Sequence, residues 1–122
     1  MIFGIGIDSA EIARLAKSAQ RENFINRCFG ASEILLYEKR GKRAETLAAA
    51  FAAKEALVKA LGVGLFAYDM RSIELLRHDS GRPYFVLHTE ILQFIEENNL
   101  RIQVSVTHEA GIATAIVVVE NI

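Results

Sequence analysis

Proline, cysteine and tryptophan are nearly absent from this chain of 122 residues, which has one proline, one cysteine and no tryptophan. A single cysteine excludes an internal disulfide framework and is typical of a reducing compartment. Basic and acidic residues nearly cancel, at 14 against 15, so the charge gives no reason to expect nucleic acid or a membrane surface as a partner. No apolar run approaches the roughly 18 residues of a membrane span, and no signal peptide is visible at the N-terminus. We therefore expect a soluble, cytoplasmic protein.

The scarcity of proline and the lack of serine- or glycine-rich stretches argue against an internal linker. Hydrophobic residues make up 52% of the chain, which is enough for a core, and 122 residues fit one domain spanning 1–122. Cys28 lies between Arg27 and Phe29 in a segment that looks packed, and this favours a structural thiol over a nucleophile.

Hydrophobic periodicity predicts elements in the order β-α-α-α-β-β-α-β-β. This order lacks the regular alternation of a doubly wound sheet, so we expect an α+β domain with helices packed on a small, mainly antiparallel sheet. Asp79, Ser80 and Gly81 indicate a hairpin turn, and Ser32 and Thr89 are expected to cap helices. The predicted strands cover about 2–7, 72–77, 83–87, 101–107 and 112–119, and the predicted helices cover about 9–21, 32–39, 44–61 and 89–97, with a short turn or helix at 25–29.

The helix predicted over 44–61 carries an acid and a base, Glu55 and Lys59, four residues apart in a sequence of small and apolar residues. One interpretation is an ordinary i, i+4 ion pair, which contributes roughly 0.2–0.5 kcal/mol. The other is a reactive surface, because small neighbours leave room for another molecule to approach. At about 100° per residue, the flank with Glu55 and Lys59 also holds Ala44, Ala48, Ala52 and Gly62, beside an apolar stripe of Leu47, Phe51, Val58 and Leu61.

Two glycines precede Asp8 in the segment Gly4-Ile5-Gly6-Ile7-Asp8. The segment fails as a dinucleotide fingerprint, because Ser9 replaces the third glycine and no acidic residue ends a following strand at the right distance. The glycines permit close backbone approach, either by a ligand or by a packed helix. Asp8 followed three residues later by Glu11 fits a capping box. Capping and metal binding can coexist at Asp8, since a carboxylate has two oxygens.

Asp8 and Glu55 together supply the number of carboxylates with which proteins commonly hold Mg²⁺, the other ligands being substrate phosphates and water. Lys59, one helical turn beyond Glu55, is placed to reach a phosphate oxygen on the same metal-bound group. A metal, two carboxylates and a cationic clamp suit a reaction at a diphosphate. No covalent nucleophile with an evident base accompanies them.

Several short motifs follow one another along almost the whole chain: Gly4 to Asp8, Glu11 to Arg14, Phe51 to Ala56 with Lys59 and Ala60, Gly62 to Gly64, Gly81 to Tyr84, and Ser105 to His108. In their order and spacing the chain resembles the holo-acyl-carrier-protein synthase family, the small type of 4′-phosphopantetheinyl transferase. The resemblance implies that fold, and transfer of 4′-phosphopantetheine from coenzyme A to a serine of an acyl carrier protein. It also implies Mg²⁺, release of adenosine 3′,5′-bisphosphate, a place in fatty acid biosynthesis, and a homotrimer with active sites between subunits.

The resemblance makes Asp8 and Glu55 the metal ligands and Lys59 a contact of the diphosphate. Glu55, directly or through a metal-bound water, is the first candidate to accept the serine proton, and Lys59 is the second. Lys54 falls within the apolar stripe, where a lysine can bury its stem and keep its charge at the surface. The family motif also has a lysine at this position, which gives the alternative of a second cation near the diphosphate.

The resemblance places the loop of Gly62, Val63 and Gly64 near the phosphates of coenzyme A. It makes Ser105, Thr107 and His108 contacts on the nucleotide side. Without the resemblance, His108 reads as a turn residue before Gly111.

Ala50 departs from the family, which usually has a basic residue, commonly Arg, just before Phe51 and near the nucleotide of coenzyme A. Loss of a charge-assisted hydrogen bond costs about 1–3 kcal/mol. The departure therefore predicts lower coenzyme A affinity, unless Lys42 or Arg43 compensates.

Arg14, Lys17 and Arg21 form a basic stripe on the first predicted helix, away from its apolar side. Such a stripe is ordinarily a solvated face. Here it has an expected partner, because carrier proteins are strongly acidic and a basic stripe would steer and orient them.

Two other classes of function compete with the transferase: a non-catalytic module that binds coenzyme A or a nucleotide, and a purely structural trimer. Ala50 is the only support for the binding module. Asp8, Glu55 and Lys59 argue against both classes, because neither needs a metal beside a diphosphate clamp.

Overall fold

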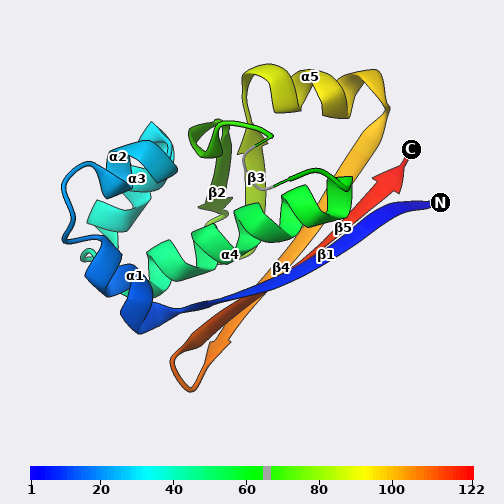
Figure 1. The fold of residues 1–122 in the computed structure, drawn as a ribbon. Helices are drawn as coiled ribbons and strands as arrows, with labels where there is room; N and C mark the ends of the chain where they lie inside the picture. The colour runs from blue at the N-terminus through cyan, green and yellow to red at the C-terminus, as the bar shows by residue number, and fades with distance from the viewer. Residues whose placement is uncertain (65–66) are drawn as a thin grey trace.

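The computed structural model describes residues 1–64 and 67–122. The predicted α+β class is confirmed, with one long helix packed between a three-stranded sheet and a group of smaller elements (Figure 1). In chain order the elements are β1 (Ile2–Glu11), α1 (Ile12–Ser18), α2 (Phe24–Cys28), α3 (Ala31–Lys39), α4 (Ala44–Leu61), the 3₁₀ helix η1 (Met70–Ser72), β2 (Ile73–Arg77), β3 (Pro83–Leu87), α5 (Thr89–Glu97), β4 (Leu100–Glu109) and β5 (Ile112–Asn121).

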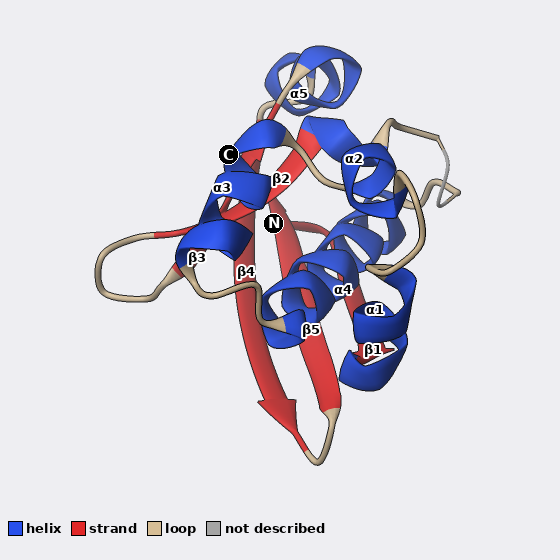
Figure 2. Cartoon of the chain, turned by 90° about the vertical axis from the view of Figure 1, so that its left-hand side faces the viewer, coloured by secondary structure: helices blue, strands red, loops and turns tan. Residues whose placement is uncertain are grey.

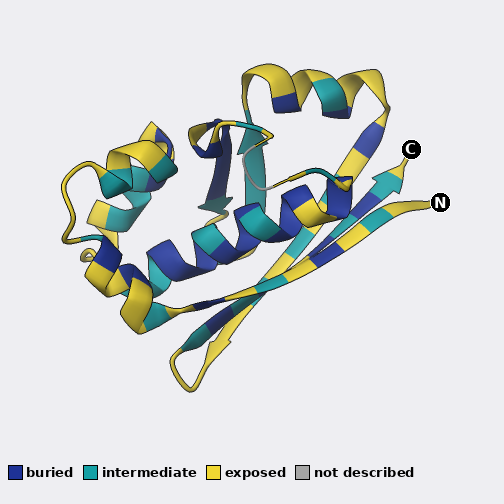
Figure 3. Cartoon of the chain, viewed as in Figure 1, coloured by how far each residue is buried: buried dark blue, intermediate teal, exposed yellow. Residues whose placement is uncertain are grey.

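The three long strands pair antiparallel in the order β1-β5-β4, and β2 and β3 form a separate antiparallel hairpin. Helix α4 runs along one face of the long sheet, and α5 lies at the end where β4 begins (Figures 1 and 2). Burial alternates along β5, so one side faces α4 and the other faces outward (Figure 3). The inward side of β5 consists of the buried residues Ala113, Ala115, Val117 and Val119.

The glycines of β1 are required by a packed helix, which was one of the two alternatives that their positions left open. A β-carbon on Gly4 would lie 1.9 Å from the carbonyl oxygen of Ala60, and one on Gly6 would lie 1.8 Å from that of Ala56. Both distances are far below van der Waals contact, so only glycine allows the strand to lie this close to α4. The same closeness explains why α4 is so rich in alanine. The approach brings the side chains of β1 and α4 within reach of each other.

The N-terminal boundary was predicted wrongly. The strand does not end at Asp8 but continues to Glu11, because pairing with β5 holds it as far as the Glu11–Ile112 pair. Helix α1 therefore starts at Ile12 and ends at Ser18, which leaves Arg21 beyond its end. The capping box at Asp8 does not form, since Asp8 lies within the strand.

Two predicted helix caps are also wrong. Helix α3 begins one residue before Ser32, and its cap is Gly30, whose N–H donates to the Glu33 carboxylate at 3.0 Å. In α5 the cap position belongs to His88, and Thr89 is the first helical residue. The hairpin turn after β2 and the end of α4 at Gly62 agree with the predictions.

Lys54 differs from both interpretations of the sequence. Its side chain is wholly buried, and its ammonium forms an ion pair of 2.5 Å with the equally buried Glu33. It neither reaches the surface nor points to the flank of α4 that carries Glu55.

Cys28 is half-buried at the end of α2, and burial raises the pKa of its thiol, as expected for a packed residue. Within the described residues, no helix is both long and apolar enough to span a membrane.

Candidate active site

Asp8 and Glu55 meet where β1 crosses α4. Asp8 lies on the inward side of its strand, between Gly6 and Ala10. Burial, followed by a hydrogen bond to Asp8 and the charge of Asp8, raises the pKa of Glu55 to about 7. Asp8 and Glu55 therefore act on each other as neighbours at this crossing. Two neighbouring carboxylates make a negative site that a cation would stabilise.

Lys59 completes this group from the next turn of α4. Its Nζ donates to the Ile7 carbonyl at 3.1 Å and to Oδ1 of Asp8 at 3.3 Å. The sequence suggested an ion pair between Lys59 and Glu55, but the ion pair that forms joins Lys59 to Asp8. The Lys59 side chain is 57% exposed, so a phosphate can approach it.

The donor set fits Mg²⁺ that keeps ligands from outside the protein. Within the described part of the chain, no cluster of three or more His, Cys, Asp or Glu side chains is arranged to hold a metal ion. Two carboxylates alone do not complete an octahedron, and Mg²⁺ commonly completes it with substrate phosphates and water. Asp8 and Glu55 are the residues that would hold the ion.

A hollow of about 310 Å³ opens beside Glu55, between α1, α2 and α4. The guanidinium of Arg14 lies 5.9 Å from the ring centroid of Phe51, and that of Arg21 lies 6.0 Å from that of Phe24. The hollow thus combines an apolar floor with two cations at its edge. Its lining consists of Arg14, Leu15, Ser18, Arg21, Phe24, Phe51 and Glu55, and Lys17 is not among these residues.

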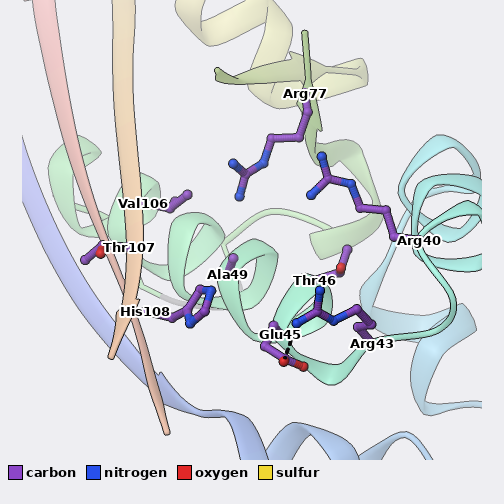
Figure 4. A pocket seen from close by; sticks show the side chains of 9 residues that line it. All are labelled: Arg40, Arg43, Glu45, Thr46, Ala49, Arg77, Val106, Thr107 and His108. Atoms are coloured by element: carbon purple, nitrogen blue, oxygen red, sulfur yellow. Dashed lines mark hydrogen bonds and ion pairs between the residues drawn. The ribbon is translucent and has the colours of Figure 1, made fainter. Parts of the chain in front are cut away.

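A second hollow, of about 390 Å³, lies near the N-terminal end of α4 (Figure 4). Three arginines enter it from different elements, and Figure 4 shows His108 turned toward Ala49 from β4. Burial and the charge of Arg40 lower the pKa of Arg77, which shows that the cations are crowded together. Such a hollow suits a phosphorylated ligand. Its lining consists of Arg40, Arg43, Glu45, Thr46, Ala49, Arg77, Val106, Thr107 and His108.

Sequence reasoning found part of this second hollow. Thr107 and His108 line it, as does Arg43, which was proposed to compensate for Ala50. Ser105 does not line it, and pairs with Ile116 on the outward side of the sheet. Lys42 does not line it either.

Arg40 and Arg77 were missed. Arg40 directly follows α3 and Arg77 is the last residue of β2, so the sequence showed each only as a charge at the end of an element. Ala50 is buried in the core and it is Ala49 that lines the hollow. The only sequence signal was the density of basic residues over 39–43.

The loop predicted to lie near phosphates follows the last turn of α4, three residues after Lys59. Gly62 has a φ of 75° and closes α4 by donating to the Lys59 carbonyl at 3.0 Å. A β-carbon on Gly62 or Gly64 would meet nothing within 4 Å, so both glycines face open space. Neither lines the two hollows.

The chain matches a family and several solved structures over nearly its whole length. The family model of the 4′-phosphopantetheinyl transferase superfamily matches residues 4–117. The chain is 41% identical over 126 residues to the holo-[acyl-carrier-protein] synthase of Clostridium kluyveri, covering 100% of this chain and 94% of that protein. It is 36% identical over 121 residues to that of Fusobacterium nucleatum, covering 98% and 99%.

Two solved structures show the same fold. The holo-[acyl-carrier-protein] synthase of Neisseria meningitidis has a TM-score of 0.88 at 30% identity, covering 99% of this chain and 100% of that one. The Bacillus anthracis holo-(acyl-carrier-protein) synthase, solved in complex with CoA (3′,5′-ADP), has a TM-score of 0.81 at 30% identity, covering 100% and 99%. The chain is therefore a transferase that belongs to the 4′-phosphopantetheinyl transferase superfamily, with holo-[acyl-carrier-protein] synthases as its relatives.

Proposed function

We propose that this chain transfers 4′-phosphopantetheine from coenzyme A to a serine of an apo acyl carrier protein, with Mg²⁺, and so serves fatty acid biosynthesis. The observation that carries the proposal is the meeting of Asp8, Glu55 and Lys59 at the crossing of β1 and α4. The reaction is the one known for the family, and these three side chains offer two metal ligands and a cation for the diphosphate. A module that only binds coenzyme A has no use for two carboxylates held against each other.

The reaction breaks the phosphoanhydride bond of coenzyme A and forms a phosphoester bond to the carrier serine. The serine oxygen of the carrier attacks the β-phosphorus of coenzyme A, the bond to the bridging oxygen breaks, and adenosine 3′,5′-bisphosphate leaves. When bound by Asp8 and Glu55, Mg²⁺ offsets the negative charge of the diphosphate. Lys59 exchanges its contact with Asp8 for a phosphate oxygen and so holds the reacting group in place. Glu55, directly or through a metal-bound water, is the first candidate to accept the serine proton, and Lys59 is the second.

The hollow with three arginines is the proposed site for the nucleotide of coenzyme A. Arg40, Arg43 and Arg77 offer charge-assisted hydrogen bonds to phosphate, and His108 offers a ring nitrogen or a stacking surface. Relatives solved with coenzyme A, including that of Helicobacter pylori at 32% identity and a TM-score of 0.80, support this assignment of ligand.

The hollow beside Glu55 is the proposed docking site for the carrier protein. It would receive an apolar side chain over Phe24 and Phe51, while Arg14 and Arg21 pair with acidic residues around it. Its position would bring the carrier serine toward Glu55. Lys17, the third residue of the predicted stripe, is exposed outside this hollow and would contribute only to long-range attraction.

A homotrimer with shared sites is also part of the proposal. Ile5, Ile7 and Ile116 are each more than 40% exposed on the outward side of the long sheet, where water would be excluded by a second copy. Thr46 and Glu55 are nine residues apart, so at about 100° per residue they leave α4 on opposite sides. The two hollows therefore face different directions on one chain. Coenzyme A in the nucleotide hollow and a carrier protein in the hollow beside Glu55 must nevertheless meet for the reaction. We therefore propose that the two hollows of one active site come from neighbouring subunits.

Mass spectrometry tests the proposed function directly. An apo acyl carrier protein incubated with the chain, coenzyme A and Mg²⁺ should gain the mass of 4′-phosphopantetheine on its serine. Omission of Mg²⁺, or use of a carrier whose serine is replaced by alanine, should abolish the gain. No gain with the intact carrier at saturating Mg²⁺ and coenzyme A would exclude the proposed reaction.

A further inference from the structure

A buried network of charged side chains surrounds Lys54, immediately before Glu55 in α4. The Lys54 ammonium donates to the Cys28 carbonyl at 2.7 Å, to Oε1 of Glu33 at 2.5 Å and to the Met70 carbonyl at 3.0 Å. An ammonium has three N–H donors, and all three are used. Burial lowers the pKa of Lys54 and raises that of Glu33, while the opposite charge of each partner limits the shift.

The network continues from Glu33 into β2. Oε1 of Glu33 accepts from the Gly30 N–H and Oε2 accepts from the Leu75 N–H, each at 3.0 Å. Glu74 accepts from the Glu33 N–H at 3.0 Å through one oxygen and lies 2.7 Å from Nε2 of His88 through the other. One lysine thus joins α4 to the end of α2, to α3, to η1 and, through Glu33, to β2.

These are the elements that supply both hollows. Phe24 of α2 lines the hollow beside Glu55, and its ring packs edge-on against Phe29, over which the Lys54 ammonium lies at 4.6 Å. Arg40 directly follows α3 and Arg77 ends β2, and both line the hollow with the arginines.

The direction of Glu55 depends on the same contacts. Lys54 and Glu55 are consecutive, so their side chains leave the helix about 100° apart. A helix whose Lys54 is held by three segments cannot rotate about its axis, and Glu55 is then held toward Asp8.

We propose that Lys54 is a positioning residue, which fixes the rotation of α4 and the placement of α2, α3 and β2, and thereby aligns Glu55 with both hollows. The effect of Lys54 on transfer kinetics rests on the proposed function, and its effect on the placement of α2, α3 and β2 does not. Lys54, the lysine of the motif from Phe51 to Ala56, thus belongs to the buried side of α4 and does not contact the diphosphate.

The test compares Lys54→Met, which keeps the length of the side chain and removes its charge, with Ile91→Ala. Ile91 is fully buried in α5, which supplies no residue to either hollow, so its truncation controls for lost stability alone. Three properties are measured well below both melting temperatures: hydrogen exchange, binding of adenosine 3′,5′-bisphosphate by calorimetry, and transfer kinetics. Circular dichroism verifies that each variant is folded.

In Lys54→Met we expect the Gly30, Glu33 and Leu75 amides to lose protection, because their acceptors belong to the network. We also expect nucleotide affinity and kcat to fall on the order of tenfold, the size typical for residues that orient ligands. Ile91→Ala should lower the melting temperature and leave all three properties near those of the wild type. If Lys54→Met does not fold, the same three properties are measured in Glu33→Gln. This variant keeps one oxygen for Lys54 but turns an amide group toward a backbone N–H, which breaks the network at that point.

Lys54→Met with protected amides, or with the nucleotide affinity and kcat of Ile91→Ala, overturns the proposal. If the wild type itself fails to transfer phosphopantetheine, the proposed function fails, and the exchange data still decide whether Lys54 holds these segments.

Discussion

Lys59 forms its ion pair with Asp8, 51 residues earlier in the chain, at 3.3 Å between Nζ and Oδ1. The same carboxylate raises the pKa of Glu55, one helical turn before Lys59, through a hydrogen bond and through its charge. Two carboxyl groups and one ammonium therefore converge on one point, with Asp8 between the other two. The group carries an excess of negative charge when both acids are ionised, and a divalent cation would remove it.

Metal dependence is expected to run through Asp8 and Glu55. Asp8→Asn and Glu55→Gln keep the size of each side chain and remove one ligand charge. Since a bound metal contributes several kcal/mol to the transition state, each variant should lose on the order of 100-fold or more in turnover. Steady-state kinetics with titrated Mg²⁺ measures this. Asp69→Asn is the control, because Asp69 is exposed and paired with Arg71. Near-normal activity of either variant at limiting Mg²⁺ would refute the metal site.

The pKa of Glu55 predicts how Mg²⁺ binding depends on pH. Below pH 7 Glu55 of the metal-free site is mostly protonated, and this proton competes with the metal. The Mg²⁺ concentration for half-maximal activity should therefore rise by roughly tenfold per pH unit well below pH 7 and level off above it. A half-saturating concentration that stays constant between pH 6 and pH 8, in about the range where Glu55 titrates, would show that no proton is displaced.

The raised pKa of Glu55 also predicts how the stability of the metal-free chain depends on pH. Stability should fall as the pH rises, whereas Mg²⁺ binding should strengthen. The folded pKa lies above the usual 4.5, so between about pH 4.5 and pH 7 the folded state holds a proton that the unfolded state has lost. This contribution to stability is present at low pH and is lost as pH rises through 7. In Glu55→Gln, chemical denaturation should show a flatter pH dependence over that window.

The local pattern of the sequence correctly placed Glu55 and Lys59 one turn apart on a long helix, because a helix fixes which residues share a side. It predicted the strand at Asp8 but not its length, because the last residues of β1 are held by β5, more than 100 positions later. Asp8 and Glu55 were assigned to one site from the ligand preferences of Mg²⁺ and from the resemblance to a family, because periodicity alone does not show which distant segments meet.

Tertiary partners account for what was missed. Lys54 was expected to bury only its stem or to face the diphosphate, because the acceptor of its charge, Glu33, lies on another helix. Arg40 and Arg77 likewise meet only in the folded chain. A charged residue in an apolar stripe of a helix is itself a signal, and it requires a search for a distant partner of opposite charge.

Arg77 is expected to bind the nucleotide without taking part in chemistry. Arg77→Met keeps the stem and removes the charge, and the loss of one charge-assisted hydrogen bond is worth about 1.5–3 kcal/mol. The KM for coenzyme A should therefore rise on the order of tenfold while kcat changes little, because the nucleotide end keeps its charge during the reaction. Arg82→Met, on the exposed turn of the same hairpin, is the matched control. Equal KM values for the two variants would remove Arg77 from the site.

Activity is expected to require association through the outward side of the long sheet. Ile116→Lys places a charge at the centre of this side, opposite Ile7 and Ser105, and burying an unpaired charge in an interface is costly. Sedimentation should show monomers, and transfer should be lost while circular dichroism is unchanged. Leu35→Lys, at an exposed apolar residue of α3, should leave both assembly and activity intact. A wild-type chain that is a fully active monomer at the assay concentration would contradict the shared site.

Arg14 is expected to govern the carrier protein and not coenzyme A. It lies over Phe51 at the edge of the hollow beside Glu55, where a bound carrier would present its serine. Arg14→Glu should therefore raise the KM for the carrier several-fold or more and leave that for coenzyme A unchanged. Because the Arg14 charge also lowers the pKa of Glu55, the comparison is made at saturating Mg²⁺.

Lys17→Glu is the matched control for that variant, since Lys17 belongs to the same stripe but lies outside the hollow. It should weaken the carrier interaction less than Arg14→Glu does. The wild-type KM for the carrier should also rise with salt, because exposed charges are screened over about 8–10 Å at physiological ionic strength. If Arg14→Glu behaves like Lys17→Glu and salt has no effect, the stripe is only a solvated face. Carrier recognition would then have to be sought elsewhere on the surface of the assembly.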